Sequence, residues 1–310
     1  MVGEWYFSTL GALVCFSLLF QLLRFIYRHW FRGSFSWEPY RGEWAVVTGA
    51  SYGIGAAYAV QLAKNGLNVV LIARSVDKLQ QVAQQVEKNG AKSQIISFDF
   101  ASASVDDWKR LENQLSSLTT SVLVNNVGVN VSLPTSFLEM DEEKIHQIVQ
   151  VNIVATQKIT RLIVPKMVQR KKGVVLFLSS GGGVLSPAPY LSVYSGTKAY
   201  ENALALALAG ELESSGVVVQ SITPFFITSE MSKIRKSSLA VPSAERFARD
   251  SLKSVGYEVS CNPYWFHEFL ALVISYLPLK LQIRYVAKLH RGLREKGLRK
   301  MSSAEKKSKI

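Results

Sequence analysis

Tyr194 and Lys198 are the residues whose types and spacing most directly suggest chemistry. They stand four apart in Tyr194-Ser195-Gly196-Thr197-Lys198, and residues four apart share one face of a helix. A phenol titrates near pH ~10, and a fixed positive charge beside it favours the phenolate, which brings proton transfer at neutral pH within reach. Because an ordinary exposed helix gives the same spacing, a second motif is needed to make the prediction specific.

A glycine-rich segment earlier in the chain supplies that motif. It reads Thr48-Gly49-Ala50-Ser51-Tyr52-Gly53-Ile54-Gly55. Residues 43–48 before it predict a short buried strand, and residues 54–64 predict the helix that follows. Glycines let the backbone approach a pyrophosphate closely, and the start of a helix offers unpaired N–H groups to the anion. The segment therefore predicts a nucleotide site.

Strand-like and helix-like segments alternate along most of the chain. The predicted strands cover residues 43–48, 68–73, 94–98, 122–124, 174–178 and 217–222. Such alternation predicts an α/β fold, a Rossmann-type doubly wound parallel sheet with a ligand at its carboxyl edge. The chain has 310 residues, 48% of them hydrophobic, enough for one full core. Cys15 and Cys261 lie in different segments and indicate neither a disulfide framework nor a metal site.

The T-G-x-x-x-G-x-G and Y-x-x-x-K spacings together resemble the short-chain dehydrogenase/reductase family, and other landmarks follow in that family's order. Asp99, Asn126 and Ser180 each follow a predicted strand, and Asn152 lies in a long helical stretch. Several strings, W-A-V-V-T-G-A, V-L-V-N-N-V-G-V, L-S-S-G and K-I-R-K among them, are similar to the membrane-bound 17β-hydroxysteroid dehydrogenase branch, near type 12 and the very-long-chain 3-oxoacyl-CoA reductases.

The resemblance implies a role for each catalytic residue. Tyr194 donates a proton to the substrate carbonyl, Lys198 holds the nicotinamide ribose and lowers the tyrosine pKa, Ser180 hydrogen-bonds the carbonyl, and Asn152 supports a water relay. The implied cofactor-binding residues are Gly49, Ser51, Tyr52, Gly53, Ile54, Gly55, Arg74, Asp99, Asn126, Tyr194, Lys198, Ile227 and Thr228. One departure concerns the interval from Ser180 to Tyr194, which is 14 residues and one longer than this branch leads us to expect. Ser180 could then sit slightly off, or the loop at residues 185–189 could absorb the extra residue.

The end of the second strand bears on the choice of cofactor. An acidic residue there would accept hydrogen bonds from the adenosine ribose, whereas this chain has Ala73-Arg74-Ser75. A guanidinium can pair with a 2′-phosphate through its planar fork. The sequence therefore favours NADP(H) over NAD(H), with an Arg74 turned to solvent as the alternative.

The N-terminal segment predicts a membrane anchor. Residues 5–23 carry no charge and form about 28 Å of helix, enough to cross a bilayer core. A cleaved signal peptide is the alternative, but Glu4 rather than basic residues precedes the run. Arg24, Arg28 and Arg32 follow it, so the positive-inside rule places the next domain in the cytosol.

The C-terminal part combines an apolar stretch with a basic tail. The apolar core at residues 269–277 is too short to span a membrane; it either embeds in one leaflet or covers the pocket, or it is buried on the core. Residues 280–310 hold 11 Lys and Arg against two acidic residues, within a net charge of +13 for the chain. Beside a membrane anchor, anionic lipid is a closer partner for this tail than nucleic acid.

These observations predict three parts: an anchor and linker at residues 1–42, an NADP-binding domain at 43–262, and a hydrophobic segment with the basic tail at 263–310. The resemblance implies an endoplasmic reticulum membrane protein that reduces a 3-oxoacyl-CoA in fatty-acid elongation, or alternatively a 17-ketosteroid. It also allows a homodimer and association with other elongation enzymes. An inactive, membrane-tethered interaction protein is the remaining hypothesis. Lys233, Arg235 and Lys236 could meet the phosphates of coenzyme A.

Overall fold

The computed structural model describes residues 2–308, and the side chains of residues 8–303. Contacts within the chain divide it into two units, residues 1–34 and residues 35–310. The sequence-based boundary after residue 42 stays a prediction of domain organisation. We describe each unit by itself.

The first unit is one long apolar helix. Helix α1 covers Val2–Ile26, and a π-helical turn, η1, continues it over Tyr27–Phe31. Within Ser8–Phe31, the most apolar window of 18 residues has a mean hydropathy of 1.9, and none of that window is buried. A helix of this length and composition is able to cross a bilayer, although a signal sequence passes the same test. The side chains of residues 5–7, where the predicted anchor begins, lie outside the described ones.

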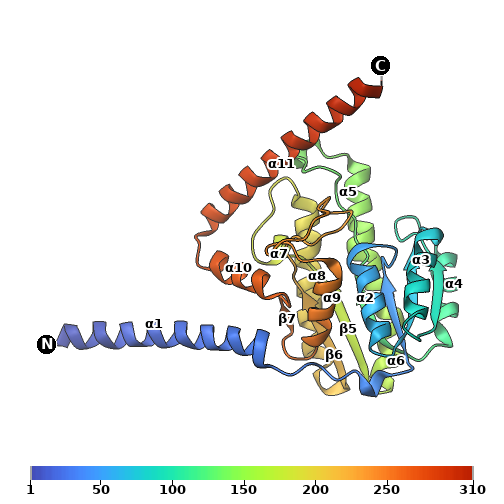
Figure 1. The fold of residues 1–310 in the computed structure, drawn as a ribbon, viewed down its shortest axis with the longest axis horizontal. Helices are drawn as coiled ribbons and strands as arrows, with labels where there is room; N and C mark the ends of the chain where they lie inside the picture. Colours follow the sequence, from blue (N-terminus) through green and yellow to red (C-terminus); the bar gives the residue numbers. More distant parts are fainter. Residues whose placement is uncertain (1, 309–310) are drawn as a thin grey trace. The chain divides into compact units, whose positions relative to one another are not determined.

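The second unit contains a seven-stranded parallel sheet, with the strand order β3-β2-β1-β4-β5-β6-β7 (Figure 1). The strands are β1 Trp44–Thr48, β2 Asn68–Ala73, β3 Ser93–Ser97, β4 Thr120–Asn125, β5 Gly173–Leu178, β6 Val217–Ile222 and β7 Ser260–Cys261. The direction of winding reverses between β1 and β4, and in open α/β sheets this is where ligands bind. The predicted doubly wound α/β fold is therefore confirmed.

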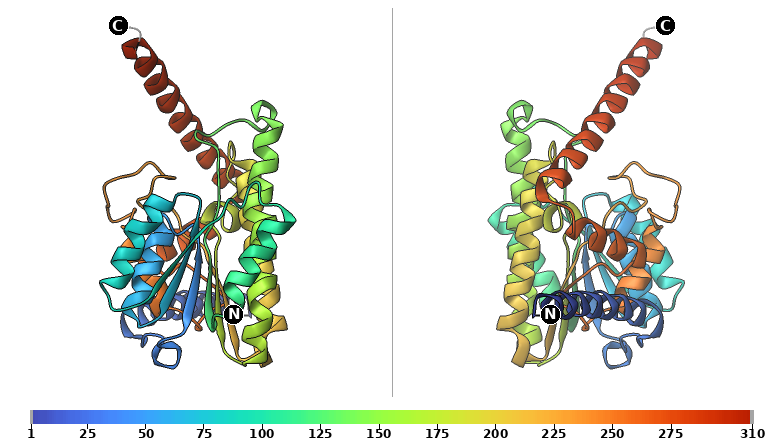
Figure 2. Two further views of the ribbon diagram at one scale, coloured as in Figure 1. Left: turned by 90° about the vertical axis from the view of Figure 1, so that its right-hand side faces the viewer. Right: turned by 90° about the vertical axis from the view of Figure 1, so that its left-hand side faces the viewer.

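Helices cover both faces of the sheet (Figure 2). They are α2 Gly53–Lys64, α3 Val76–Glu87, α4 Val105–Ser116, α5 Glu142–Val149, α6 Ala155–Gln169, α7 Gly181–Val184, α8 Ser192–Glu211, α9 Ala244–Lys253, α10 Trp265–Ser275 and α11 Leu279–Ser308. Short turns lie at η2 Glu38–Tyr40, η3 Phe137–Glu139, η4 Gln150–Val154 and η5 Glu213–Ser215. Helices α2, α3 and α9 pack on one face of the sheet, and α4, α6 and α8 pack on the other.

The core explains why the strands read as continuous apolar runs. Val46, Leu71, Val124 and Leu176 are fully buried because both faces of the sheet are covered. Two clusters of buried side chains, one on each face, hold the layers together. The segment at residues 35–42 joins this core, where the Trp37 indole donates a hydrogen bond to the Leu252 carbonyl.

Candidate active site

The glycine turn links β1 to α2 at the carboxyl edge of the sheet. Gly49 and Gly53 have φ angles of +65° and +61°, which favour glycine. A Cβ on Gly55 would lie 2.3 Å from the Gly49 carbonyl oxygen, so no larger residue fits there. The turn and the first residues of α2 therefore pack tightly and leave backbone N–H groups at the start of a helix, which is the form of a pyrophosphate cradle.

Thr48 and Asn126 tie that turn to the end of β4. The Thr48 hydroxyl accepts hydrogen bonds from the backbone N–H groups of Asn126 and Val127, both at 3.0 Å. The Asn126 amide donates to the carbonyl oxygens of Thr48 and Gly49 at 2.9 and 3.1 Å. These bonds join β1 to β4 across the point where the sheet reverses, so they fix the geometry of the predicted nucleotide site.

The remaining cofactor residues from the first half of the sheet lie around this turn. Tyr52 caps the start of α2 and lies under the Lys78 amine, which is 4.9 Å from the ring centroid. Arg74 is exposed just beyond the end of β2, and Asp99, beyond β3, accepts a hydrogen bond from the Ala101 N–H at 3.0 Å. The Arg74 side chain is thus accessible at the carboxyl edge, where a 2′-phosphate would need it.

Asn152 lies in the π-helical turn η4 between α5 and α6, within the long helical stretch that the sequence predicted. Its carboxamide is fully buried: the oxygen accepts from the Val129 N–H at 2.8 Å, and the nitrogen donates to the Val129 carbonyl and the Thr197 hydroxyl. π-helical turns often occur at functional sites. Gly128 lies beside it, where a Cβ would be 3.5 Å from both the Asn152 oxygen and the Lys198 amine.

The structure brings Ser180 and Tyr194 together despite the long interval between them. Ser180 follows β5 and caps α7, and its hydroxyl lies close enough to the Tyr194 phenol to lower the pKa of that phenol. In the loop between them, Tyr190 has a φ of +68° and the Ser195 hydroxyl accepts a hydrogen bond from the Ala188 N–H at 3.3 Å. An interval of 14 residues is therefore compatible with a Ser180 hydroxyl that lies beside Tyr194.

Lys198 is buried on α8, one turn after Tyr194. Its amine donates to the Leu178 carbonyl oxygen at 2.7 Å and lies 5.8 Å from the centroid of the Tyr194 ring. Burial raises the pKa of Tyr194, and Lys198 and Ser180 oppose that rise only in part. Lys198 thus lowers the pKa of Tyr194 as expected, but burial outweighs this effect and holds the phenol in its protonated form.

Glu201, which the sequence reasoning missed, is the third charged group of this cluster. Both of its carboxylate oxygens lie 2.9 Å from the Lys198 amine, and only 1% of the residue is exposed. Burial raises the pKa of Glu201 to about 7, although Lys198 opposes the shift. Burial alone would lower the pKa of Lys198, but Glu201 leaves it raised. A signal was present in the sequence, because a residue three positions after Lys198 shares its helix face.

The segment between β6 and α9, residues 223–243, lies at the carboxyl edge of the sheet, and we call it the lid. Ile227 is buried and the Thr228 N–H donates to the Pro242 carbonyl oxygen. A Cβ on Gly53 would lie 3.4 Å from the Ser229 Cβ, which places the lid against the glycine turn. On the other side, the Lys233 amine donates to the Ser132 carbonyl oxygen at 2.7 Å. The lid therefore spans from the glycine turn to the loop after β4.

His267 from α10 connects both ends of the lid. Its Nδ1 accepts from the Phe225 N–H at 3.4 Å, and its Nε2 lies 3.2 Å from the Ala240 carbonyl oxygen. Nearby, the Tyr264 hydroxyl donates to the Leu239 carbonyl oxygen. Burial lowers the pKa of His267 to about 4, so the ring is neutral at physiological pH. The sequence reasoning passed over this histidine because it stands in an apolar stretch.

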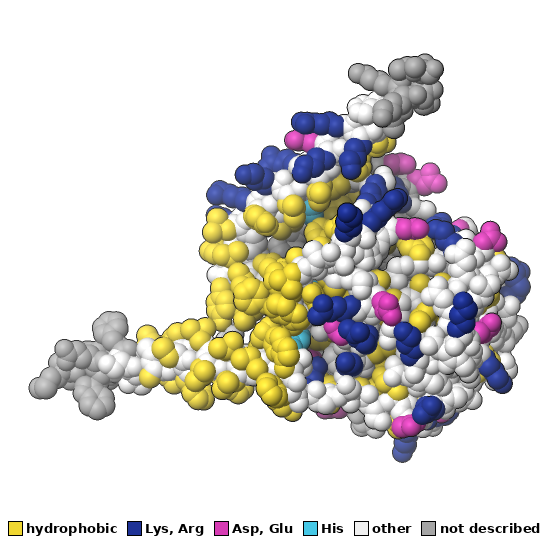
Figure 3. Space-filling view, viewed as in Figure 1, with side chains coloured by type: hydrophobic (Ala, Val, Ile, Leu, Met, Phe, Trp, Pro, Cys, Tyr) yellow, Lys and Arg dark blue, Asp and Glu magenta, His cyan; other side chains and the backbone are white. Residues whose placement is uncertain are grey.

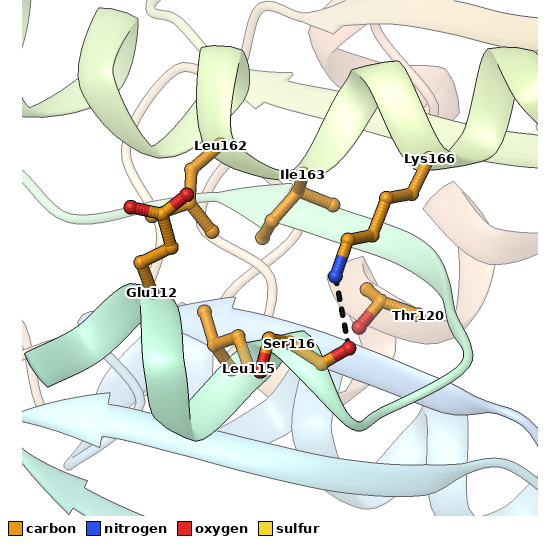
Figure 4. A pocket seen from close by; sticks show the side chains of 7 residues that line it. All are labelled: Glu112, Leu115, Ser116, Thr120, Leu162, Ile163 and Lys166. Atoms are coloured by element: carbon orange, nitrogen blue, oxygen red, sulfur yellow. Dashed lines mark hydrogen bonds between the residues drawn. The ribbon is translucent and has the colours of Figure 1, made fainter. Parts of the chain in front are cut away.

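A pocket between α4 and α6 is separate from these residues (Figure 4). It is lined by Glu112, Leu115, Ser116, Thr120, Leu162, Ile163 and Lys166. Lys166 closes one side by donating to the Ser116 carbonyl oxygen at 2.9 Å. Thr120 begins β4, so the pocket lies at the amino edge of the sheet, opposite the cluster around Tyr194.

Comparison with known proteins identifies the family. The model of the short chain dehydrogenase family matches residues 43–239. The chain belongs to the short-chain dehydrogenase family. Among relatives, the very-long-chain 3-oxoacyl-CoA reductase of Rattus norvegicus is 41% identical over 266 residues, which is 84% of each chain. That of Pyricularia oryzae is 34% identical over 319 residues and covers 99% of this chain and 96% of its own. As a short-chain dehydrogenase, the chain is an oxidoreductase whose fold binds a nicotinamide cofactor.

Solved structures of this family agree with the fold. A 7β-hydroxysteroid dehydrogenase matches with a TM-score of 0.72 and 21% identity, covering 81% of this chain and 99% of its own. A metagenomic short-chain oxidoreductase in complex with NADP matches with a TM-score of 0.61 and 27% identity, covering 72% and 96%. The former speaks to the fold alone, and the latter shows a family member of this architecture with NADP bound.

Proposed function

We propose that this short-chain dehydrogenase is a membrane-anchored, NADPH-dependent reductase of very-long-chain 3-oxoacyl-CoA, acting in fatty-acid elongation. The observation that carries the proposal is the cluster of Asn152, Ser180, Tyr194 and Lys198 at the carboxyl edge of the sheet, in a chain about 40% identical to reductases of that name. All four residues are present: Thr197 links the Asn152 carboxamide to the Tyr194 carbonyl oxygen, and Lys198 and Ser180 both act on the Tyr194 phenol. This arrangement argues against an inactive interaction protein.

The glycine turn and its neighbours fit the cofactor. Close packing of the turn leaves no room for a Cβ on Gly55, and the unpaired N–H groups at the start of a helix such as α2 suit the binding of an anion. We propose that Gly49, Gly53 and Gly55 hold the pyrophosphate and that Arg74 pairs with the 2′-phosphate of NADP(H). Lys198 would meet the nicotinamide ribose. When bound, NADPH supplies the hydride.

The proton comes from Tyr194. As the substrate carbonyl carbon accepts the hydride, negative charge grows on its oxygen, and the Tyr194 phenol and the Ser180 hydroxyl can both donate hydrogen bonds to it. Tyr194 then transfers its proton and leaves the 3-hydroxyacyl product. Because burial holds the phenol protonated, the resting site is prepared for reduction. Asn152, fixed by Val129 and Thr197, would support the relay that returns a proton to Tyr194.

The membrane location belongs to the same proposal. An apolar N-terminal helix followed by Arg24, Arg28 and Arg32 favours an anchor with the catalytic unit on the cytosolic side. The endoplasmic reticulum is proposed from the resemblance to the membrane-bound reductases. A homodimer and an association with other elongation enzymes remain predictions.

The experiment is turnover of the purified full-length chain with NADPH against a long-chain 3-oxoacyl-CoA and estrone, side by side. We expect a higher kcat/KM for the acyl-CoA, measured as loss of NADPH absorbance. Higher kcat/KM with estrone would replace the proposal by 17-ketosteroid reduction. No turnover with either substrate, from protein that still binds NADPH, would support the inactive interaction protein.

A further inference from the structure

Helix α11 presents three different faces. At the turn from α10, Gln282 is buried and donates to the carbonyl oxygens of Ile274 and Leu277. Farther along α11, the packed face carries His290, which is buried and whose Nδ1 lies 2.6 Å from the Pro189 carbonyl oxygen. A second face is an exposed apolar stripe at a spacing of four, formed by Leu281, Tyr285, Leu289 and Leu293. A third face is an exposed basic stripe formed by Lys280, Arg284, Lys288 and Arg291. The packed face fixes how the other two point.

Helix α10 continues the apolar stripe. Phe269 and Val273, four apart on this helix, and Tyr276 and Leu277 directly after it are 44–60% exposed. Figure 3 shows hydrophobic side chains gathered over α10 and along the adjoining side of α11, with Lys and Arg along the other side of α11. An exposed apolar patch bordered by basic residues is typical of a surface that meets a membrane.

We propose that α10 and the first half of α11 form a second membrane contact, which lies in the interface of a bilayer containing anionic lipids. The apolar stripe would enter the boundary between headgroups and acyl chains, and the basic stripe would pair with lipid phosphates and carboxylates. The apolar core of α10 is too short to cross the bilayer, so it lies along the surface. A bilayer is also the partner that a membrane-spanning α1 would bring near this unit.

This contact would lie next to the reaction site. His290 and Arg294 of α11 hold the loops at Pro189 and Glu139, which flank the catalytic residues. On the other side of α10, His267 holds both ends of the lid. If the chain reduces an acyl-CoA as proposed, lipid would therefore border the loops around the site where a long acyl chain must enter.

The test measures the depth of one position in the full-length chain reconstituted in lipid nanodiscs. Leu281→Cys, in a Cys15→Ser background, carries an environment-sensitive fluorophore, and the control is the same label at Val105→Cys on α4, where the native side chain is 69% exposed. We expect a blue shift and quenching by spin-labelled lipids at position 281 but not at 105. The anchor holds both variants on the same disc, so attachment itself cannot produce the difference.

The charge of the lipid distinguishes a membrane from other possible partners of this surface. Quenching at position 281 should increase when about 30% phosphatidylserine replaces neutral lipid, and Lys280→Ser/Arg284→Ser/Lys288→Ser should abolish that increase. Equal signals at 281 and 105 would overturn the proposal. A blue shift in detergent that depends on protein concentration would also overturn it, because a second copy of the chain would then cover the face. Neither readout requires catalytic turnover, so the result is independent of the proposed reaction.

A second, independent observation concerns Glu201, a buried carboxylate that the reaction does not consume. We infer that Glu201 is a positioning residue that holds the Lys198 amine and offsets its charge, which keeps Tyr194 in the proton-donating form and favours reduction over oxidation. Both carboxylate oxygens contact the amine at 2.9 Å. This inference rests on the proposed function.

The electrostatics around Glu201 support this direction. Lys198 and Tyr194 are the titratable groups that act on this carboxylate and on each other, and Glu201 is among the causes that raise the pKa of Tyr194. Two neutral groups also lie near the Lys198 amine: the Asn152 carboxamide from η4 and the Leu178 carbonyl from the end of β5. Removing the carboxylate charge would therefore leave Lys198 as an uncompensated positive charge beside the phenol.

Glu201→Gln tests the inference through the pH profile of kcat/KM. The alkaline limb for reduction should move to lower pH by about one unit, and the acidic limb for oxidation of the 3-hydroxyacyl-CoA with NADP⁺ should move in the same direction. The control is Glu211→Gln, an exposed position on the same helix, which should leave both limbs in place. Glu201→Leu should give the same shift and keeps the test open if the glutamine variant does not fold. If an active, folded variant shows both limbs at the same pH as the wild type, the inference is wrong. If the wild-type protein itself shows no turnover, the proposed function is contradicted instead.

Discussion

Two regions of the molecule differ in which side chains they bury: the cluster around Tyr194, and the surface formed by the lid, α10 and α11. Around Tyr194 the charged groups are buried and each has partners, because an unpaired charge in the interior is costly. At the other end, apolar side chains such as Leu281 are exposed, and basic side chains surround them. The first region must hold a proton in a fixed place, whereas the second must meet a partner outside the chain.

His267 shows how the two regions are joined. It lies on α10, next to the exposed apolar surface, yet its two ring nitrogens contact the two ends of the lid over the site. A change in one region can therefore reach the other through a small number of hydrogen bonds. Variants that act on only one region will show whether the division is real.

The largest expected effect is on the reaction step. Tyr194→Phe keeps the ring but removes the proton donor, so turnover should fall by roughly 10²-fold or more. Binding of NADPH, followed by fluorescence titration, should change little. If Tyr194→Phe retained most of the activity, another group would have to be the acid, and the buried cluster would lose its proposed role.

The contact between the regions should be visible as a pH dependence of stability. Burial lowers the pKa of His267 to about 4 from the ordinary value of 6.5, so the unfolded chain binds a proton that the folded chain does not as pH falls between these values. Stability should therefore decline by about 3 kcal/mol from pH 7 to pH 4 through this group. Denaturant unfolding in detergent measures this effect. The free energy of unfolding of the wild type should exceed that of His267→Gln by less at pH 4 than at pH 7. The difference from His146→Gln, at an exposed position, should not change with pH. Parallel stability curves for the wild type and His267→Gln would contradict the prediction.

An intermediate effect is expected at the cofactor end. Arg74→Ala should weaken NADPH by about 1.5 to 3 kcal/mol through loss of a charge-assisted contact, and should change NADH binding much less. Isothermal titration with both nucleotides measures the difference. Similar losses for NADPH and NADH would mean that Arg74 does not contact the 2′-phosphate.

The smallest effect is expected at the lid surface. Arg235 and Lys236 are exposed, whereas the Lys233 amine already donates to the Ser132 carbonyl oxygen. Arg235→Glu/Lys236→Glu should raise KM for a 3-oxoacyl-CoA roughly three- to tenfold, because exposed ion pairs contribute ~0.2–1 kcal/mol each. The increase should shrink at high salt and be absent with an uncharged ketone. An equal rise for both substrates would indicate a disturbed lid instead of a contact with coenzyme A.

Residue order by itself determined the fold class and most of the site. Strand, glycine turn and helix at residues 44–64 are local in the chain, so their propensities and spacing predict them, and the parallel sheet follows from the alternation of elements. The spacing of four between Tyr194 and Lys198 likewise placed both on one face of α8. These features depend on residues that are close together in the sequence, so one sequence is enough to predict them.

Tertiary structure decided how those residues act. Burial raises the pKa of Tyr194 although Lys198 is close. The extent of that burial depends on long-range packing, which no sequence pattern gives. The fold also brings Ser180 beside Tyr194 although 14 residues separate them, and the stripe on α11 stays exposed because another face of that helix packs on the loop at Pro189. Periodicity shows that a helix has an apolar side, but long-range packing selects which apolar side chains are covered and which remain for a partner.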